Sequence, residues 1–502
     1  MITLLTLLVA LGLLGWGFVR ARPYGKLGIL AWLQSVVLMA PWLLFFGLFT
    51  IGIYLNLAGV LLLFLVSTGL YIFLGNRLRA LGQDAALARR ISAIAEAQAN
   101  QTDEAQTSES AETDLGQGSQ TQPAARKEAE EIIPIPAEDL QAIKGIFGID
   151  TFFATETIPF QDGAIFRGNL RGEIATSYQS LSETLKQRVG DRYRLFLVEG
   201  QDGKPVVIVL PSSRDPQPLT TPQKAIAAVL LLVTLAACLE SGGLMLGFDF
   251  FTEPARIAEV LPLGIGILAI LLVHEAGHWL LARRHQVSLS WPFFIPTWQI
   301  GSFGAITRFE SLLPNRKVLF DVAFAGPAAG GLLSLLMLIT GLVLSHKGSL
   351  FQIPTEFFQG SILVGTLSRV VLRESLQESL VDVHPLVVIG WLGLVINALN
   401  LLPAGQLDGG RIVQAIYGRK VAGRTTIGSI IVLGLAAIIN PLALYWGIVV
   451  LFLQRELERP CLNDLVEADD ARAALGLLAL FLMITTLLPL TPSLAGRLGI
   501  GG

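Results

Sequence analysis

The sequence predicts a polytopic α-helical membrane protein of about 8–10 transmembrane segments that carries a small soluble α+β domain. The chain has 502 residues, of which 52% are hydrophobic and only 15% are charged, whereas soluble domains carry roughly 25% charged residues. Several apolar runs are long enough to cross a bilayer, while residues 137–212 have the mixed polarity of a soluble domain. A formal net charge of -3 argues against a nucleic-acid binder. Two cysteines offer no disulfide framework.

A transmembrane helix needs about 20 predominantly apolar residues. The run from 425 to 453 is interrupted by Asn440-Pro441, so it predicts two short helices around that breaker rather than one tilted span. The N-terminal run lacks the Arg- and Ser-rich lead of an organelle transit peptide, and it predicts a membrane anchor. The other expected spans are about 2–19, 28–49, 51–75, 224–247, 257–282, 319–345, 385–402 and 473–490.

Basic residues gather in the loops after several of these spans, as in Arg283-Arg284 after the run 257–282. The positive-inside rule places such loops in the cytosol. A further basic group precedes the run 425–453, and a hairpin in that run keeps Arg455 and Arg459 on the same side. The sequence therefore predicts that these loops all face the cytosol.

Four regions follow from these patterns. Residues 1–90 form an N-terminal transmembrane region with three spans, and residues 91–136 form an acidic linker that is too polar to fold alone. Residues 137–212 form the soluble α+β domain, with a helix, strand-like segments around GNLRG, a second helix and a hairpin closed by a QDG turn. Residues 224–490 form the main membrane domain.

The motif HEAGH, from His274 to His278, lies inside the apolar run 257–282. Because residues i and i+4 share one face of a helix, the two histidines can bind one zinc ion, and Glu275 can take a proton from its water. Ionisable groups in hydrocarbon are costly and are functional by default. The alternative, a histidine pair that bonds neighbouring helices, gives Glu275 no role. The pattern therefore predicts a zinc hydrolase site within the bilayer.

A catalytic zinc site needs three protein ligands and one open position. The motif NALNLLPAGQLDGGR at 397–411 breaks an apolar span and places Asp408 on irregular backbone at membrane depth, where a carboxylate needs a partner. Asp408 is therefore favoured as the third ligand, and the alternative is an N-cap of the helix that follows. Three further histidines are expected to be polar residues outside the ligand set: His285, His346 and His384.

Two loops adjoin the expected site. The segment SLSWPFFIPTWQIGSFGAITRF (288–309) alternates with Gly and Pro, and it predicts a β-ribbon or re-entrant loop that roofs the site. If the loop 285–317 presents an edge strand, it can pair with an unwound substrate segment. Residues 350–383 are amphipathic in parts, which fits either a lateral gate for substrate or an interfacial helix.

HEAGHW together with NLLPAGQLDGGR resembles the site-2 protease family of intramembrane zinc metalloproteases, and FAGPAAGG (324–331) fits the family's small-residue packing helix. GNLRG (168–172), HPLVVIGWLGL (384–394) and the AGQ turn resemble the plastid and cyanobacterial branch of that family. In plants this branch is named for ethylene-dependent gravitropism deficiency and yellow-green leaves. The resemblance covers about residues 137–490.

The resemblance implies that His274, His278 and Asp408 hold one Zn²⁺ per chain. It also implies that Glu275 is the general base and that Asn400 stabilises the oxyanion or holds the substrate strand. The expected partners are the lipid bilayer and a transmembrane segment of another membrane protein as substrate, with no nucleic acid. The expected location is the plasma or thylakoid membrane of a cyanobacterial cell, with the active site towards the cytosol.

Two other functions stay open on the sequence. A catalytically silent membrane scaffold would keep the fold without cleavage, although the full catalytic set is present. A zinc or proton transporter would use the buried His and Asp residues, but the runs 224–247 and 319–345 offer few further polar residues for a pathway. For GNLRG, the favoured interpretation is a turn that requires glycine. The alternative is that its Arg171 bonds a carboxylate of the acidic linker.

Overall fold

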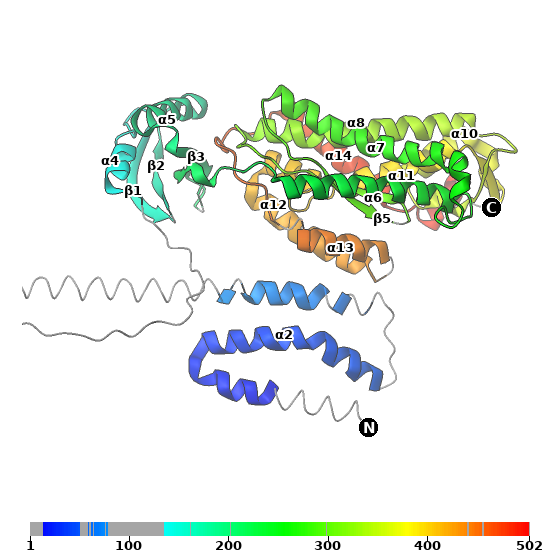
Figure 1. The fold of residues 1–502 in the computed structure, drawn as a ribbon, viewed down its shortest axis with the longest axis horizontal. Coiled ribbons are helices and arrows are strands. Elements are labelled where there is room, and N and C mark those ends of the chain that lie inside the picture. Colours follow the sequence, from blue (N-terminus) through cyan, green and yellow to red (C-terminus); the bar gives the residue numbers. More distant parts are fainter. Residues whose placement is uncertain are drawn as a thin grey trace, which may run out of the picture. The chain divides into compact units, whose positions relative to one another are not determined.

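The computed structural model describes residues 14–50, 59, 62–63, 65–75, 77–78, 135–160, 162–200, 202–297, 299–438, 441–453 and 456–500 (Figure 1). The chain divides into two compact units. Residues 1–131 and 430–453 form the first unit, and residues 132–429 and 454–502 form the second. Nearly all of the predicted acidic linker and most of the predicted first span lie outside the described residues.

Among the described residues, the first unit contains the apolar helices α2 (Gly25–Thr50) and α13 (Pro441–Leu453) and a shorter apolar helix at Leu65–Gly75. α2 matches the predicted span 28–49. Leu65, from a second N-terminal helical stretch, packs with Ala437 and Leu451 in a small apolar core. This unit is therefore held together by side chains from both ends of its sequence.

The run that the sequence divides at Asn440-Pro441 is also divided in the structure. The helical segment α12 (Asp408–Ala436), which has a kink at Gly418, ends before this dipeptide, and α13 begins at Pro441. Proline fits the first turn of a helix because the N–H that it lacks would have no partner there. The prediction of two helices around this breaker is confirmed.

The predicted soluble α+β domain lies in the second unit. Its elements are α4 (Ala137–Lys144), β1 (Phe152–Phe160), β2 (Gly163–Leu170), α5 (Ile174–Val189), β3 (Tyr193–Glu199) and β4 (Pro205–Pro211). The strands form one antiparallel sheet in the order β1-β2-β4-β3. The strand-forming run PVVIVLP makes β4, one of the two central strands. Both helices pack on the sheet around a core that includes Phe152, Phe166 and Leu197.

The motif GNLRG begins within β2. A Cβ on Gly168 would lie 2.1 Å from the carbonyl oxygen of Phe153 on β1, so only glycine fits this close approach. The register of β1 and β2 shifts between Ala154 and Glu156, which places a β-bulge beside this glycine. Arg171 is exposed. These contacts favour the structural interpretation of the motif at its first glycine.

Among the described residues, four helices are long and apolar enough to cross a membrane: Thr221–Met245, Pro254–Arg284, Arg316–Leu344 and Asp470–Leu487. Shorter apolar helices occur at Gly28–Val37, Leu65–Gly75 and Pro385–Asn400. Beyond the soluble domain, the helices of the second unit include α6 (Thr221–Met245), α7 (Ile257–Arg284), α8 (Arg316–Leu344), α11 (Pro385–Asn400), α14 (Asp470–Leu487), α15 (Pro492–Leu498) and the first part of α12. The predicted polytopic helical membrane fold with a soluble α+β domain is confirmed.

The helix α8 packs against both α7 and α11 (Figure 1). Small residues bring the helix backbones close together, as is common between transmembrane helices. A Cβ on Gly390 of α11 would lie 2.4 Å from the backbone nitrogen of Leu338 on α8. A Cβ on Gly341 of α8 would lie 2.5 Å from the backbone nitrogen of Val387. The close packing of these three helices forms the frame of the candidate site.

The predicted β-ribbon between α7 and α8 is confirmed. It consists of β5 (Phe293–Thr297) and β6 (Gly301–Ile306), which pair antiparallel. Residues 351–383 form β7 (Phe351–Pro354), α9 (Glu356–Gln359), α10 (Ile362–Leu372) and β8 (Leu380–Val383). Phe358 and Val364 of this segment are fully buried in the main apolar core. The segment is thus packed onto the helices, and its role as a substrate gate stays a prediction.

Candidate metal centre and active site

The HEAGH motif lies on α7, in a helix that is long and apolar enough to cross a membrane. His274 and His278 share one face because they are four residues apart. Both residues are buried, with only 6% and 5% of their surfaces exposed. Their Nε2 atoms lie 3.1 Å apart. The pair of converging imidazoles that the sequence predicts is therefore formed.

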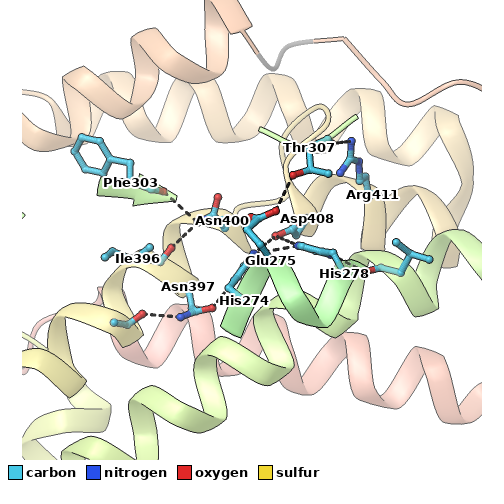
Figure 2. A network of polar contacts seen from close by, with 12 residues as sticks. His274, Glu275, His278, Phe303, Thr307, Ile396, Asn397, Asn400, Asp408 and Arg411 are labelled. Carbon is cyan, nitrogen blue, oxygen red and sulfur yellow. Dashed lines mark hydrogen bonds and ion pairs between the residues drawn. The ribbon is translucent and has the colours of Figure 1, made fainter. Parts of the chain in front are cut away.

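Asp408 is the first residue of α12 and meets the histidine pair (Figure 2). Its Oδ2 lies 3.2 Å from Nε2 of His274 and 3.4 Å from Nε2 of His278. The glycine that follows permits this placement, because a Cβ on Gly409 would lie 1.9 Å from the carbonyl oxygen of Leu401. Contacts with two imidazoles favour the ligand interpretation of Asp408 over the helix N-cap.

The other ring nitrogen of each histidine has a fixed partner. Asn397 donates its side-chain amide to the carbonyl oxygen of Gly393 at 2.8 Å, so its Oδ1 accepts from Nδ1 of His274, also at 2.8 Å. Nδ1 of His278 donates to the carbonyl oxygen of Val322 on α8 at 2.7 Å. Both rings are thereby held with the proton on Nδ1, and both Nε2 atoms carry a lone pair.

These converging atoms fit a zinc ion. Two imidazole lone pairs and one carboxylate oxygen lie between 3.1 and 3.4 Å from one another. Zinc bonds of about 2.0–2.1 Å place tetrahedral ligand atoms roughly 3.3–3.4 Å apart. Three acceptors held this close repel one another unless a cation or a proton lies between them. The set of two nitrogens and one oxygen therefore suits Zn²⁺ in number, type and spacing.

Two glycines of FAGPAAGG on α8 leave room for the histidines. A Cβ on Gly326 would lie 2.1 Å from Nε2 of His278. One turn later, a Cβ on Gly330 would lie 2.9 Å from the Cβ of His274 and 2.7 Å from Oδ1 of Asn397. The segment that fits a packing helix in the sequence thus shapes the metal centre directly.

Glu275 lies beside the histidines and adjoins a small cavity (Figure 2). Its Oε2 accepts a 2.7 Å hydrogen bond from the hydroxyl of Thr307, which directly follows β6. The cavity volume of about 10 Å³ is close to the least that one water molecule needs. The cavity is lined by Glu275, His278, Ala305, Ile306, Thr307, Asn400, Gln406, Leu407, Asp408 and Arg411. It therefore borders both the carboxylate of Glu275 and the metal centre.

Asn400 lines the same cavity, yet its amide hydrogens are used within the fold. Its Nδ2 donates to the carbonyl oxygens of Phe303 at 3.2 Å and Ile396 at 2.9 Å (Figure 2). A Cβ on Gly304, which has a φ of 107°, would lie 2.6 Å from this nitrogen. Asn400 thus ties β6 to α11.

The remaining histidines have partners other than the metal centre. Nε2 of His285 lies 3.1 Å from Asp321, and Nδ1 of His346 lies 3.0 Å from a neighbouring backbone carbonyl oxygen. His384 caps α11, because its Nδ1 accepts a hydrogen bond from the backbone nitrogen of Leu386. The structure brings together His274, Glu275, His278, Asn400 and Asp408, and it leaves these three histidines outside that group.

Sequence reasoning missed two side chains that support the site. Asn397 lies three residues before Asn400 in the same NALN motif. A second amide side chain one helical turn from a candidate site residue could have identified it as a partner of the site. Thr307 gave no such signal, because it is separated from Glu275 by 32 residues and only the path of the β-ribbon brings them together.

Residues 263–440 match the family model described as Peptidase family M50, and residues 141–218 match the EGY3 middle domain. The probable zinc metalloprotease EGY1, chloroplastic, of Oryza sativa subsp. japonica is 38% identical over 406 residues, which cover 73% of this chain and 70% of that protein. The chain belongs to peptidase family M50. A second relative of this M50 chain, EGY1 of Arabidopsis thaliana, is 39% identical over 401 residues, covering 72% of this chain and 73% of that protein.

The chain is also similar to a second kind of chloroplastic zinc metalloprotease, EGY2. The probable zinc metalloprotease EGY2, chloroplastic, of Arabidopsis thaliana is 38% identical over 363 residues, covering 71% of this chain and 65% of that protein. No solved structure matches the M50 chain. The predictions of family, enzyme class and cofactor are confirmed: the chain is an intramembrane zinc metalloendopeptidase.

The predicted location in a bacterial, cyanobacterial membrane is wrong by these comparisons. The matched relatives are chloroplastic proteins of plants, so they point to a plastid membrane instead. That prediction rests on two grounds, the N-terminal run without the lead of a transit peptide and the motifs of the plastid and cyanobacterial branch, and these motifs do not distinguish the two compartments. Similarity to chloroplastic proteins over most of the chain is stronger information about the compartment.

Proposed function

We propose that His274, His278 and Asp408 bind the zinc ion of this M50 protease and that Glu275 is its general base. The single observation that carries this proposal is the spacing of 3.1 to 3.4 Å among the two Nε2 atoms and Oδ2 of Asp408. When bound, zinc supplies Lewis-acid polarisation of the scissile carbonyl and acidifies water. The chain's own residues orient the ligands, exclude bulk water and move the proton.

Glu275 is suited to proton transfer because only one of its oxygens is engaged. Thr307 holds Oε2, and no hydrogen bond to Oε1 is recorded among the described residues. Oε1 takes the proton of the attacking water as the oxygen–carbon bond forms, and Glu275 then gives that proton to the leaving amine nitrogen as the carbon–nitrogen bond breaks. The products are one new carboxyl group and one new amine.

For Asn400 we propose a positioning role rather than oxyanion stabilisation. Its amide nitrogen already donates to the carbonyl oxygens of Phe303 and Ile396, so a donor for an oxyanion is free only if one of these bonds opens. The bond to Phe303 holds β6 against α11, beside the cavity. Asn400 thereby keeps the β-ribbon in place over the site.

Membership of an intramembrane protease family implies a membrane-protein substrate. We propose that the substrate is a transmembrane helix of another protein and that its unwound segment pairs with the end of β6. Ala305 and Ile306 line the catalytic cavity, so a strand docked along them would carry its carbonyl groups past Glu275. Helical substrate must unwind first, because each carbonyl oxygen in a helix is already hydrogen-bonded.

A photo-crosslinking residue in place of Ile306 tests this docking. In the inactive Glu275→Gln background it should trap a tagged single-span substrate, whereas the same residue in place of Leu332, which is 69% exposed on α8, should not. Equal trapping at both positions would exclude β6 as the docking strand.

We also propose that the predicted regions act as separate units: the transmembrane region 1–90, the linker 91–136, the GNLRG domain 137–212 and the protease domain 224–490. The separate core of the soluble domain and the family match over 141–218 support its boundaries. Residues 430–453 lie within the region 224–490 but group with the N-terminal residues, so we propose that this segment acts with the region 1–90.

The first experiment measures zinc content and cleavage of a panel of tagged single-span substrates, with wild type beside Glu275→Gln. Zinc in both proteins with cleavage by the wild type alone is the expected result. Zinc in both with equal cleavage would remove Glu275 as the base. A folded wild type that binds no zinc would overturn the ligand assignment.

A further inference from the structure

A buried chain of contacts holds the carboxylate of Glu275 beside the metal centre. The first contact is the 2.7 Å hydrogen bond from the hydroxyl of Thr307 to Oε2 of Glu275. The hydroxyl must be the donor, because an ionised carboxylate only accepts. Thr307 itself is buried, so no bulk water competes for this bond.

The second contact fixes Thr307. Its carbonyl oxygen accepts a 2.8 Å hydrogen bond from Nη2 of Arg411 (Figure 2). Arg411 follows Asp408 by three residues, so it lies in the first turn of α12 with that ligand. One helical turn therefore carries both a carboxylate of the metal centre and the guanidinium that holds the partner of the base.

The third contact compensates the buried charge of Arg411. Nε and Nη2 of Arg411 both lie 3.0 Å from Oε2 of Glu458. Both side chains are buried, and an unpaired charge at such a position is strongly destabilising. The guanidinium also lies over the ring of Phe309, 4.9 Å from its centroid. Arg411 has few other conformations available in this setting, so the carbonyl oxygen of Thr307 has a rigid donor.

We propose that Thr307, Arg411 and Glu458 form a positioning relay that fixes the carboxylate of Glu275 relative to Asp408 and the two histidines. The inference rests on the proposed function of Glu275 as general base. Rotation of the Glu275 carboxylate is limited by the bond to Oε2, which leaves Oε1 directed to the reacting water. Without that bond the carboxylate samples other rotamers, and a general base works only within hydrogen-bond reach of its proton.

The test compares Thr307→Val, which removes the hydroxyl at nearly constant shape, with Thr307→Ser, which keeps it. Thr307→Val should lower kcat about tenfold to hundredfold, because misplacing a reacting group by about 1 Å costs on the order of a hundredfold. KM, zinc per chain and the thermal unfolding midpoint should stay at wild-type values. Thr307→Ser should recover most of kcat.

Thr234→Val is the matched control, because the buried hydroxyl of Thr234 on α6 has no recorded hydrogen-bond partner. It should leave kcat unchanged. A second variant, Arg411→Lys, keeps the positive charge but replaces the planar guanidinium and its several N–H donors by a single ammonium group. It should lower kcat while zinc per chain stays the same. This variant tests the relay independently of any packing defect at Thr307.

The outcomes separate the relay from the proposed function. If Glu275→Gln abolishes cleavage while Thr307→Val keeps the wild-type kcat, the relay alone is wrong. If Thr307→Ser loses as much activity as Thr307→Val, the methyl group rather than the hydroxyl matters, and the relay is again overturned. If Glu275→Gln still cleaves, both the general base and its relay fail together.

Discussion

The substitution Gly326→Ala should disable the metal centre without replacing any of its proposed ligands. The added Cβ would lie 2.1 Å from Nε2 of His278 and 2.5 Å from two of its ring carbons. Ordinary contact begins at 3.4 Å, so the ring or the helix must move by about 1.3 Å. A metal ligand tolerates only about 0.2 Å of error in its bond distance.

The imidazole ring of His278 cannot move away from the new methyl group without straining a hydrogen bond. Nδ1 of His278 is bound to the carbonyl oxygen of Val322, which lies one turn before Gly326 on the same helix, so a shift away from the new methyl group stretches that bond. We expect zinc affinity to fall at least about a hundredfold, in line with the larger effects of changed ligand orientation. Overpacking should also lower the free energy of unfolding by about 1–3 kcal/mol.

The assay is competition for zinc between the purified protein and a chelator, followed by thermal unfolding. Gly331→Ala is the matched control on α8, because a Cβ at Gly331 would meet nothing within 4 Å. That control should keep wild-type affinity and a similar or higher unfolding midpoint. Wild-type zinc affinity in Gly326→Ala would refute the reasoning, because it would mean that α8 does not confine His278.

Three further predictions concern the same site and its surroundings. Asn397→Ala should weaken zinc binding about tenfold to hundredfold by freeing Nδ1 of His274, and chelator competition should show Asn397→Asp, which keeps an acceptor, close to wild type. Asp408→Asn should lower zinc per chain while the far-ultraviolet circular dichroism is unchanged; full zinc occupancy would exclude Asp408 as a ligand. Burial raises the pKa of the Cys461 thiol well above its usual range. Iodoacetamide at mildly alkaline pH should therefore label Cys461 only after the protein unfolds. Rapid labelling of Cys461 in the folded protein would contradict its burial.

The parts of the site that follow from local sequence were predictable. The four-residue spacing of His274 and His278 fixes their common face on any helix. Asp408 was recognisable because a carboxylate on broken backbone inside an apolar region needs a partner. The membrane helices and the β-ribbon were likewise predictable, since length, apolar composition and the positions of Gly and Pro act over short distances.

The supporting contacts were not predictable, because they depend on how distant segments meet. Asn397 reaches His274 across 123 residues, and Arg411 reaches the carbonyl oxygen of Thr307 across 104. Periodicity contains no information about such pairs. The role of Gly326 is a similar case: the sequence shows a small residue on a packing helix, but only the crossing of α7 and α8 shows which ring occupies the space.

The distribution of charge around the site is consistent with the proposed role of Glu275 as general base. The imidazoles of His274 and His278 converge with Asp408 on one point, and the guanidinium of Arg411 is occupied by Glu458 and a backbone carbonyl oxygen. A guanidinium paired directly with Glu275 would occupy both carboxylate oxygens in a bidentate contact. The fold instead places Thr307 between them, with its hydroxyl donating to Glu275 and its carbonyl oxygen accepting from Arg411. In the proposed relay, Arg411 therefore orders the carboxylate through Thr307, and one carboxylate oxygen stays available to water.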